Sequence, residues 1–518
     1  MTFTVPPFDG APPETPPPGW LRQRIIRGSL WLVALRWVFR GLSLVRTVVL
    51  ARLLAPADFG LFSMAMLAIR VVEVPTSLDL DVALVRRAAA DRRLFDSAWT
   101  LRAIHRLLVM GCLLLGAPLA GRYFNDPRVV PAIRVAALVG VLWAFENIGI
   151  VTFRKQLDFA KEFALDAVST LIALVVTIVA ALITRSYWAL IGGFIAERLV
   201  WVVATYVAHP YRPRVSWAAA RELWDFSRWI PVQNTGRLLR NNVDSFLVGR
   251  LFGAGPMGIY TMAGSAAGLA VVEIVGPVSD ALLPSYAQLT NEPERLGRAY
   301  IDALAMIAMV VIASQVGMAA IAPTFFPVVL GQRWVAAIPT AQWLALYSCL
   351  NTLSASVANV LVAQGRMGRL SGIIYFQLAL YAPALLLAAQ SRDLVALAMA
   401  KSAIALLVAP ILFASLIAVS SVTAGQILRV LWRPICASVP MAGVVRGLAL
   451  PWSSPSVAGL VVQIAGGVAT FGVCVGVLWL LAGRPNGAER TIVEWVTRRA
   501  GRRQLRSQRV RGYDGRAR

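Results

Sequence analysis

The stretch that decides the fold is Ala51-Arg-Leu-Leu-Ala-Pro-Ala-Asp-Phe-Gly-Leu-Phe-Ser-Met-Ala65. It joins two apolar segments, residues 29–51 and 59–84, each long enough to cross a bilayer core of about 30 Å as a helix. We therefore expect a membrane-spanning helical hairpin. Its arms carry the charged residues Arg36, Arg40, Arg46, Arg70, Glu73, Asp79 and Asp81. Because a cation near the centre of a membrane helix costs roughly 2.5–3.5 kcal/mol, we expect these side chains to line a polar, cationic cavity.

The turn of this hairpin recurs 198 residues later. Residues 50–65 align without a gap on Val248-Gly-Arg-Leu-Phe-Gly-Ala-Gly-Pro-Met-Gly-Ile-Tyr-Thr-Met-Ala263, pairing Arg52 with Arg250 and Gly60 with Gly258. Aromatic and methionine positions match as well, which favours a true duplication over a chance likeness between two apolar turns. The chain is therefore expected to contain two related halves.

The composition excludes an ordinary soluble protein. Of the 518 residues, 58% are apolar and 15% are charged, and the mean hydropathy is +0.67. We therefore expect an all-α multi-pass membrane protein. The net charge of +24 comes mostly from Arg in short connectors and in the C-terminal tail, which is typical of topology control and does not indicate nucleic-acid binding. His105 and His209 are isolated and the four cysteines lack metal-ligand spacing, so we expect neither a metal nor a cofactor.

Apolar runs of about 20 residues define the candidate membrane spans. The fourteen runs are residues 29–51, 59–84, 98–118, 130–150, 163–184, 187–208, 226–250, 257–284, 298–322, 336–363, 369–390, 394–419, 429–449 and 456–482. Arg and Lys concentrate in alternate connectors, beginning with the one after the second span, which places both termini in the cytoplasm. The two repeats begin an even number of crossings apart, so they are expected to be parallel repeats around a central pathway.

The domain organisation follows from these spans. We expect a Pro-rich cytoplasmic tail (residues 1–28), an N-terminal six-helix bundle (29–208), a cytoplasmic linker (209–225), a C-terminal six-helix bundle (226–419), an additional transmembrane pair (420–482) and an Arg-rich cytoplasmic tail (483–518). The additional pair lies outside the duplication, so the expected total is 12–14 spans.

The seventh span carries a polar stripe and a further cation, Arg240. Asn234, Arg237, Asn241 and Asp244 follow spacings of three, four and three, which places them within an arc of about 80° on one helix face. Guanidinium groups match phosphate oxygens and amides suit sugar hydroxyls, so a phosphorylated, glycosylated lipid fits such a cavity.

Two other roles are open for the charged residues of these spans. Arg36, Arg40, Arg237 and Arg240 could instead form structural ion pairs with Glu73, Asp79, Asp81 and Asp244. The carboxylates Glu73, Asp79, Asp81, Asp244, Glu273 and Asp280 are candidates for proton or sodium coupling, because desolvation favours a protonated carboxyl group; simple salt bridges are the other explanation.

Several segments resemble a known family. They are residues 51–65, Phe153-Arg-Lys-Gln-Leu-Asp-Phe159, Asn242-Val-Asp-Ser-Phe-Leu-Val-Gly-Arg250, Gly258-Ile-Tyr260 and Ala281-Leu-Leu-Pro-Ser-Tyr286. Over roughly residues 25–420 the chain is similar to the Wzx-like polysaccharide and oligosaccharide flippases of the multidrug/oligosaccharidyl-lipid/polysaccharide exporter superfamily.

The resemblance implies a function and a set of partners. The expected activity is alternating-access translocation of undecaprenyl-diphosphate-linked oligosaccharide repeat units across the bacterial inner membrane, for exopolysaccharide, capsule or O-antigen assembly. Membrane lipids, a polysaccharide polymerase and export machinery are the implied partners. By position, the substrate-binding residues are Arg36, Arg40, Arg46, Arg70, Asn234, Arg237, Arg240 and Asn241.

Other functions remain as alternatives. A drug or metabolite exporter of the same superfamily would be expected to have a smaller and more acidic cavity. A polymerase or ligase acting on the same glycans would need a large periplasmic loop, and nucleotide hydrolysis would need a glycine-rich phosphate loop; neither is found in the sequence, so no enzymatic activity is expected. A membrane scaffold would leave the charges within the spans unexplained.

Overall fold

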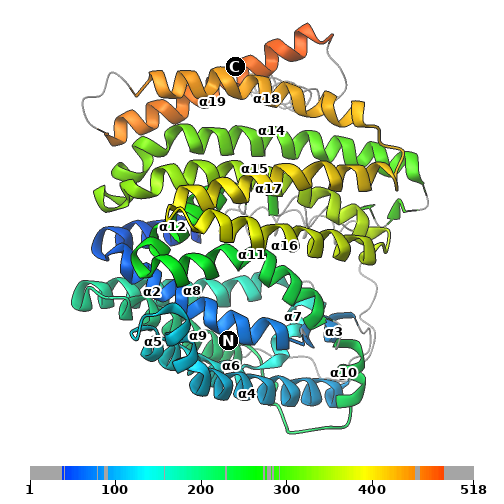
Figure 1. The fold of residues 1–518 in the computed structure, drawn as a ribbon. Helices are drawn as coiled ribbons and strands as arrows, with labels where there is room; N and C mark the ends of the chain where they lie inside the picture. The colour runs from blue at the N-terminus through cyan, green and yellow to red at the C-terminus, as the bar shows by residue number, and fades with distance from the viewer. Residues whose placement is uncertain are drawn as a thin grey trace, which may run out of the picture. The chain divides into compact units, whose positions relative to one another are not determined.

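The computed structural model describes residues 38–39, 41–78, 80–86, 91–156, 158–227, 230–271, 275–276, 282, 285–286, 288–290, 292–449 and 455–483. These residues form helices with short connections, and no strand occurs among them (Figure 1). The predicted class, an all-α multi-pass membrane protein, is confirmed. By its internal contacts the chain divides into two compact units, residues 1–261 and 262–518.

The first described residues of the N-terminal unit, 38–39 and 41–53, are helical. The unit continues with Pro56–Glu73 (α2), Val74–Thr76 (η1), Leu80–Arg86 (α3), Arg92–Phe124 (α4), Val129–Ala137 (α5), Val139–Ala144 (α6), Ile148–Ile150 (η2), Val151–Lys155 (α7), Phe159–Thr184 (α8), Trp188–Ala208 (α9), Ala220–Ser227 (α10), Ile230–Phe252 (α11) and the first half of Ala254–Ala270 (α12). The C-terminal unit contains the rest of α12 and Pro293–Phe325 (α14), Phe326–Leu330 (η4), Gln332–Ala337 (η5), Ile338–Ala363 (α15), Met367–Ala389 (α16), Leu394–Ile417 (α17), Ala424–Gly447 (α18) and Val457–Leu481 (α19).

Nine of the described helices are long and apolar enough to cross a membrane, and a bent pair would make ten. The pair is α5–α6 followed by η2–α7, with a bend of 65°, so the helix within the predicted span over residues 130–150 is broken after α6. Asn147 explains the break, because its side chain leaves the helix pattern and accepts a hydrogen bond from the Gly149 amide at 2.9 Å. The total of 12–14 spans and the six domain boundaries stay predictions.

The second arm of the first hairpin also departs from expectation. The predicted span over residues 59–84 is not one helix, because α2 ends at Glu73 and a short 3₁₀ turn containing Pro75 leads to the separate helix α3. Proline lacks the amide hydrogen that would continue the helix. At the other end, the Asp58 carboxylate accepts the Ala55 amide at 2.9 Å and holds the start of α2.

The duplicated turns lie against each other within the N-terminal unit, where α2 crosses α12. A Cβ at Gly60 would lie 1.7 Å from the Ala254 carbonyl oxygen, and a Cβ at Gly258 would lie 1.8 Å from that of Pro56. The Ser63 hydroxyl donates to Thr261 at 3.3 Å, and these two residues are also 198 positions apart. Equivalent positions of the two repeats therefore meet around a local two-fold axis, and each crossing requires glycine.

The connector after α9 is bound to the start of α4. The side-chain amide of Asn147 donates from Nδ2 to the backbone carbonyl oxygens of His209 and Tyr211, at 3.2 and 2.9 Å. The Tyr211 hydroxyl and the Arg214 amide both donate to Asp96. Tyr211 belongs to a buried cluster of apolar side chains from α3, α4 and α10, so residues 209–219 are a fixed part of this unit.

The C-terminal unit is built around α14. Helices α15, α18 and α19 pack against α14, and α17 packs on α15. Ala320 of α14, Ala437 and Met441 of α18, and Phe471 of α19 share a buried apolar cluster. Helix α18 begins with a capping box, in which Thr423 and Gln426 exchange hydrogen bonds between side chain and backbone. Residues 424–447 and 457–481 thus form a helix pair that packs on the rest of the unit.

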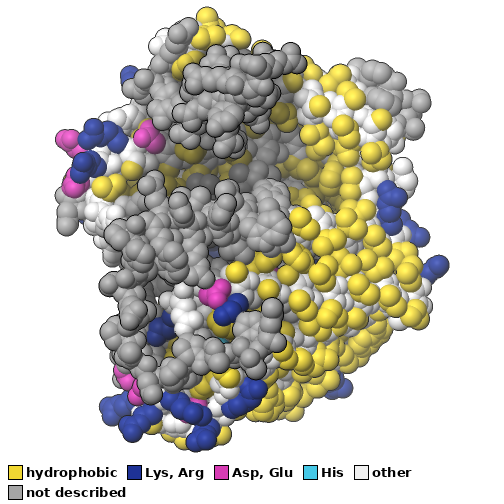
Figure 2. Space-filling model, turned by 180° about the vertical axis from the view of Figure 1, so that it is seen from behind, with side chains coloured by type: hydrophobic (Ala, Val, Ile, Leu, Met, Phe, Trp, Pro, Cys, Tyr) yellow, Lys and Arg dark blue, Asp and Glu magenta, His cyan; other side chains and the backbone are white. Residues whose placement is uncertain are grey.

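The surface is apolar over much of its area, as expected of helices that meet lipid. On the face seen in Figure 2, hydrophobic side chains form a broad surface, and Lys and Arg lie mostly towards its edges. Two leucines illustrate this apolar exposure: Leu115 of α4 is 84% exposed and Leu481 of α19 is 79% exposed. Such exposure would be costly in water and costs nothing in a bilayer.

Candidate functional site

The N-terminal unit contains a cluster of charged side chains inside its helices, which we call the α4 charge cluster. It consists of Arg46, Glu73, Asp81, Arg102, Arg106, Glu146, Glu197 and Arg198, together with Trp143 and Trp201. Helix α4 supplies the two central cations, Arg102 and Arg106, which lie one turn apart and so project from one helix face.

Arg102 connects two acidic residues. One of its Nη1 contacts is to Asp81 of α3 at 3.3 Å, and another is to the Glu146 carboxylate at 3.7 Å. Its Nη2 atom donates to the Glu146 carbonyl oxygen at 3.0 Å. Trp201 of α9 donates from Nε1 to the same carboxylate at 2.7 Å. Glu146, at the break after α6, thus holds α4 and α9 together.

Arg106 forms an ion pair with Glu73 at the end of α2. Its guanidinium carbon also lies 4.2 Å from the centre of the Trp143 ring, and that of Arg198 lies 4.6 Å from the same ring. A guanidinium over an indole face gains about 0.5–2 kcal/mol, more where water is excluded. Trp143 therefore allows two like charges to lie near each other.

The cluster is charge-balanced. Arg46 lies 3.9 Å from Glu197, which gives the cluster equal numbers of guanidinium and carboxylate groups. Burying a lone charge costs several kcal/mol, and the partner in each pair offsets this cost. The arrangement explains how charged residues are tolerated within apolar helices, and removing one member would leave its partner buried without a counter-ion.

The sequence analysis missed most of this cluster. As ion-pair partners for Glu73 and Asp81 it considered only arginines of the first and seventh spans, whereas in the structure their partners are Arg106 and Arg102 of α4. The signal was present, because cations within the apolar span 98–118 require a polar surrounding, as do Glu197 and Arg198 within the span 187–208.

Five of the predicted site residues lie outside the described residues. They are Arg36, Arg40, Asp79, Glu273 and Asp280. The placement of the first two decides whether the first span contributes cations to a cavity, so their predicted role stays a prediction.

The other predicted residues are divided between paired and exposed positions. Asn234 of α11 donates to Ser77 at 3.3 Å, just after the η1 turn, and Arg240 donates from Nε to Asn241 at 3.1 Å. Asp244 is buried and accepts the Tyr260 hydroxyl at 2.5 Å. Arg70 of α2, Arg237 and Asn241 are exposed. Helix α11 packs along α2 and η1, so the polar stripe of the second repeat borders the first repeat.

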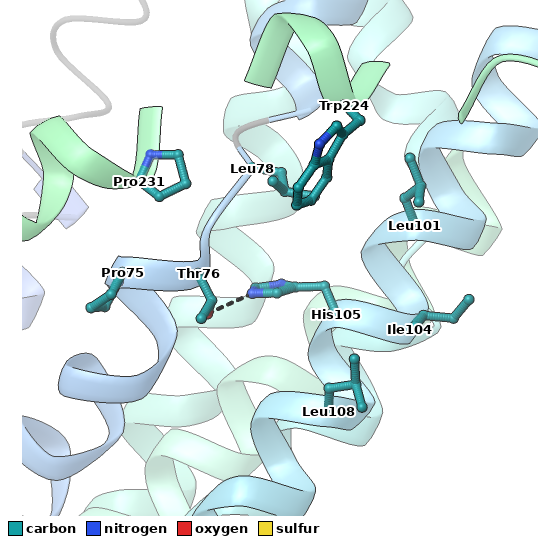
Figure 3. Close-up of a pocket in the computed structure, with 9 residues that line it drawn as sticks. All are labelled: Pro75, Thr76, Leu78, Leu101, Ile104, His105, Leu108, Trp224 and Pro231. Carbon is teal, nitrogen blue, oxygen red and sulfur yellow. Dashed lines mark hydrogen bonds between the residues drawn. The ribbon is translucent and has the colours of Figure 1, made fainter. Parts of the chain in front are cut away.

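A cavity of about 470 Å³ lies beside the charge cluster, and we call it the α4 groove. Its two walls are apolar: Leu101, Ile104 and Leu108 of α4 form one, and Trp224 of α10 and Pro231 of α11 lie on the other (Figure 3). The volume is within the range of small-molecule sites, about 300–1,000 Å³.

One polar pair bridges the α4 groove. The His105 ring reaches from α4 to Thr76 of η1, with its Nε2 atom 2.8 Å from the threonine hydroxyl (Figure 3). His105 is adjacent in sequence to Arg106, and Thr76 follows Glu73 by three residues. The groove therefore combines apolar walls with a polar contact next to the Arg106–Glu73 pair.

Sequence comparisons identify relatives of the chain. A family model described as polysaccharide biosynthesis protein matches residues 49–339. The lipopolysaccharide biosynthesis protein WzxC of Escherichia coli is 22% identical over 378 residues, which cover 71% of this chain and 76% of that protein. The succinoglycan biosynthesis transport protein ExoT of Rhizobium meliloti is 23% identical over 325 residues, or 62% of this chain and 66% of its own.

Solved structures show a similar fold. The lipid II flippase MurJ in an inward closed conformation matches with a TM-score of 0.72 at 12% identity, covering 88% of this chain and 100% of the other. An inward-facing multidrug resistance MATE family transporter of the MOP superfamily matches with a TM-score of 0.55 at 15% identity, covering 74% and 96%. At such identities the likeness concerns the fold, and it confirms the expected helical-bundle architecture.

Proposed function

This chain belongs to the polysaccharide biosynthesis protein family, and from this premise we propose that it is a flippase that moves lipid-linked oligosaccharides across a bacterial inner membrane. The Wzx-like resemblance of the sequence is confirmed by the family match and by relatives named for lipopolysaccharide biosynthesis and succinoglycan transport. The proposed cargo is an undecaprenyl-diphosphate-linked repeat unit, and the proposed mechanism is alternating access.

The observation that carries the proposal is the set of exposed polar side chains on α2 and α11, two helices that pack against each other. Arg70 of α2 and Arg237 and Asn241 of α11 are exposed, and the two helices pack together although they belong to different repeats. A lipid-facing guanidinium would cost several kcal/mol, so these groups are best explained if they face water or an anionic ligand. The charges of the α4 cluster, by contrast, neutralise each other.

The chemistry of these groups suits a diphosphate that carries sugars. Arginine presents a permanent charge and a planar set of donors for phosphate oxygens, and Asn241 offers an amide donor and acceptor for hydroxyl groups. We assign diphosphate binding to Arg36, Arg40 and Arg237, and sugar contact to Asn241. The carrier chain remains in the bilayer while the head group passes through the protein.

Substitution of the proposed diphosphate ligands tests this function. In cells, Arg36→Ala, Arg40→Ala and Arg237→Ala should each reduce export of the polymer about ten-fold or more, since a charge-assisted hydrogen bond contributes about 1.5–3 kcal/mol. Arg298→Ala, an exposed arginine of α14, serves as the matched control. Membrane levels of each variant are measured alongside.

Two results would contradict the assignment. Export that stays at the wild-type level in all three variants, at normal protein levels, would exclude these arginines as diphosphate ligands. A wild-type protein that protects cells from cationic drugs while polymer export is independent of it would instead support the alternative, a drug or metabolite exporter.

A further inference from the structure

We propose that the connector between α9 and α10 binds the head groups of anionic phospholipids. The binding surface, which we call the connector surface, consists of residues 209–219, Trp224 of α10 and the exposed arginines at the start of α4. It would meet the bilayer around the protein, whereas the proposed function concerns the cargo. Three properties of this surface support the assignment: its level along α4, its exposed aromatic side chains and its excess of exposed positive charge.

The connector is held beside the first turns of α4. The Ser216 amide donates to the Thr100 hydroxyl at 3.0 Å, and the Ala219 amide donates to the Ser97 hydroxyl at 3.0 Å. The exposed large apolar side chains of α4 begin one turn later, at Ile104. A helical turn rises about 5.4 Å, and the head-group layer on each side of a bilayer is about 5–8 Å thick. The connector therefore lies at the depth of the head groups.

The connector surface exposes apolar side chains although the segment that carries them is fixed. Val215 and Trp217 are 73% and 59% exposed, whereas the nearby Tyr211 is buried against α4. Trp224 is 53% exposed and lies across the α4 groove from Ile104 (Figure 3). Tryptophan is enriched at membrane–water interfaces, because its ring is apolar and its indole N–H can still reach polar groups. A covering of lipid explains why these rings do not pack inside the unit.

Positive charge is in excess among the exposed side chains of this region. Within residues 91–100 and 209–224 the exposed arginines are Arg92, Arg93, Arg212, Arg214 and Arg221, and the exposed carboxylates are Asp91 and Glu222. Asp91 is engaged in capping α4, where it accepts the Leu94 amide at 3.1 Å. Glu222 is adjacent to Arg221 in α10, so these two charges offset each other. The excess is thus carried by the connector and by the start of α4.

Three of these arginines are placed by their contacts around one carboxylate, Asp96. The Arg92 Nε atom lies 3.7 Å from Asp96, and its Nη2 atom donates to the Arg212 carbonyl oxygen at 3.5 Å. The Arg214 amide donates to Asp96 at 3.0 Å. Asp96 is 7% exposed and also accepts the Tyr211 hydroxyl, so it neutralises one of the three guanidinium charges at most. Guanidinium groups suit phosphate oxygens, and basic residues at the membrane surface strengthen binding to anionic lipids.

Photolabelling of the full-length protein tests the proposal. The protein is reconstituted into vesicles of phosphatidylethanolamine and phosphatidylglycerol in equal parts. One sample contains a trace of phosphatidylglycerol with a diazirine at the start of an acyl chain, and another contains phosphatidylcholine with the same diazirine. We expect the anionic probe to label residues around Val215 and Trp217 about ten-fold more than the zwitterionic probe, and the ratio to decrease at high salt.

A pair of arginine variants makes the test specific. Arg214 is exposed and contacts α4 through its backbone amide, so Arg214→Gln should fold normally and lower the labelling ratio about five-fold. Arg298→Gln is the matched control, because it makes the same change of charge at an exposed position of α14. It should leave the labelling ratio of the connector surface unchanged.

Each contrary outcome overturns the proposal. Equal labelling of the connector surface by both probes would make it an ordinary contact with bulk lipid, and labelling by neither would show that no lipid covers it. An equal decrease in Arg214→Gln and Arg298→Gln would attribute the preference to the total charge of the protein. The mapping in the wild-type protein needs no variant, and none of these results depends on polymer export, so this surface can be rejected while the proposed function stands.

Discussion

Arg102 and Arg106 lie one turn apart on α4 and bind three carboxylates from other segments of the chain. Asp81, Glu73 and Glu146 contact them directly, and Trp143 lies against Arg106. At the residue scale, the stability of this unit therefore depends on a balance of buried charges. Because of this balance, replacing one member of an ion pair should destabilise the protein more than replacing both members together.

Replacement of Arg102 tests this balance. Arg102→Met should lower the free energy of unfolding by about 2–3 kcal/mol, because the Glu146 carboxylate would remain largely buried without its counter-ion. This loss is smaller than that for a fully buried pair, because the other partner of Arg102, the Asp81 side chain, is 41% exposed to solvent. Arg93→Met, at the exposed start of the same helix, should change it by about 0.5 kcal/mol at most. Denaturation of the purified protein in detergent measures both. The double variant Arg102→Met/Glu146→Gln should recover part of the loss, and a double variant less stable than the single one would disprove the explanation.

His209 makes the connector sensitive to pH. Burial, with Arg212 and Lys161 nearby, lowers the pKa of His209. Its Nδ1 atom accepts the Tyr211 amide at 3.1 Å, which requires the neutral ring. Since the unfolded chain binds the proton at a higher pH than the folded one, the stabilisation is complete above a pH of about 6.5 and is lost as the pH falls towards the lowered value.

Hydrogen exchange of the connector measures this effect. Protection of the Tyr211 amide should decrease as the pH falls below about 6.5, after correction for the intrinsic exchange rate. In His209→Gln the protection should no longer depend on pH in this range. A wild-type connector whose protection is constant over the same interval would show that His209 does not titrate there.

At the element scale, the crossing of α2 and α12 depends on two glycines. Gly60→Ala and Gly258→Ala would each bring a methyl group onto a carbonyl oxygen of the partner turn, so each should destabilise the protein by about 1–3 kcal/mol or more. Gly116→Ala on α4 meets no atom within 4 Å and should stabilise it by about 0.5–1 kcal/mol. Thermal unfolding of the three variants in detergent provides the comparison. If Gly60→Ala and Gly116→Ala changed the stability equally, α2 and α12 would have to separate at their crossing without a measurable cost.

The same elements show how far the sequence predicts the fold. The duplicated turn was recognisable from the spacing of Arg, Gly and Met positions, and the structure places the equivalent residues Ser63 and Thr261 in contact. The breaks after α2 and α6 were not recognised, because an apolar run predicts a span without showing whether Pro75 or Asn147 interrupts it. Hydropathy measures the affinity of a segment for lipid and is insensitive to a local change of backbone direction.

At the scale of the whole molecule, the distribution of Arg and Lys predicts the orientation in the membrane. In a variant without native cysteines, a cysteine at position 214 should react with a membrane-impermeant thiol reagent only after the cells are permeabilised, and one at position 128 should react in intact cells. Both positions are exposed in connectors, the first between α9 and α10 and the second between α4 and α5. The opposite pattern would place both termini outside.

The sequence by itself determined the class of the protein, the duplication and the family, because these depend on composition and on residues close together along the chain. Only the tertiary structure decided which charges pair, since the partners of Glu73 and Asp81 are 33 and 21 residues away on a helix that the pattern of the first hairpin does not involve. The α4 groove is likewise visible only in three dimensions, because its walls come from η1, α4, α10 and α11. Local structural propensity depends on residues that are neighbours in the sequence, whereas ion pairs and cavities arise from packing between residues that are distant in it.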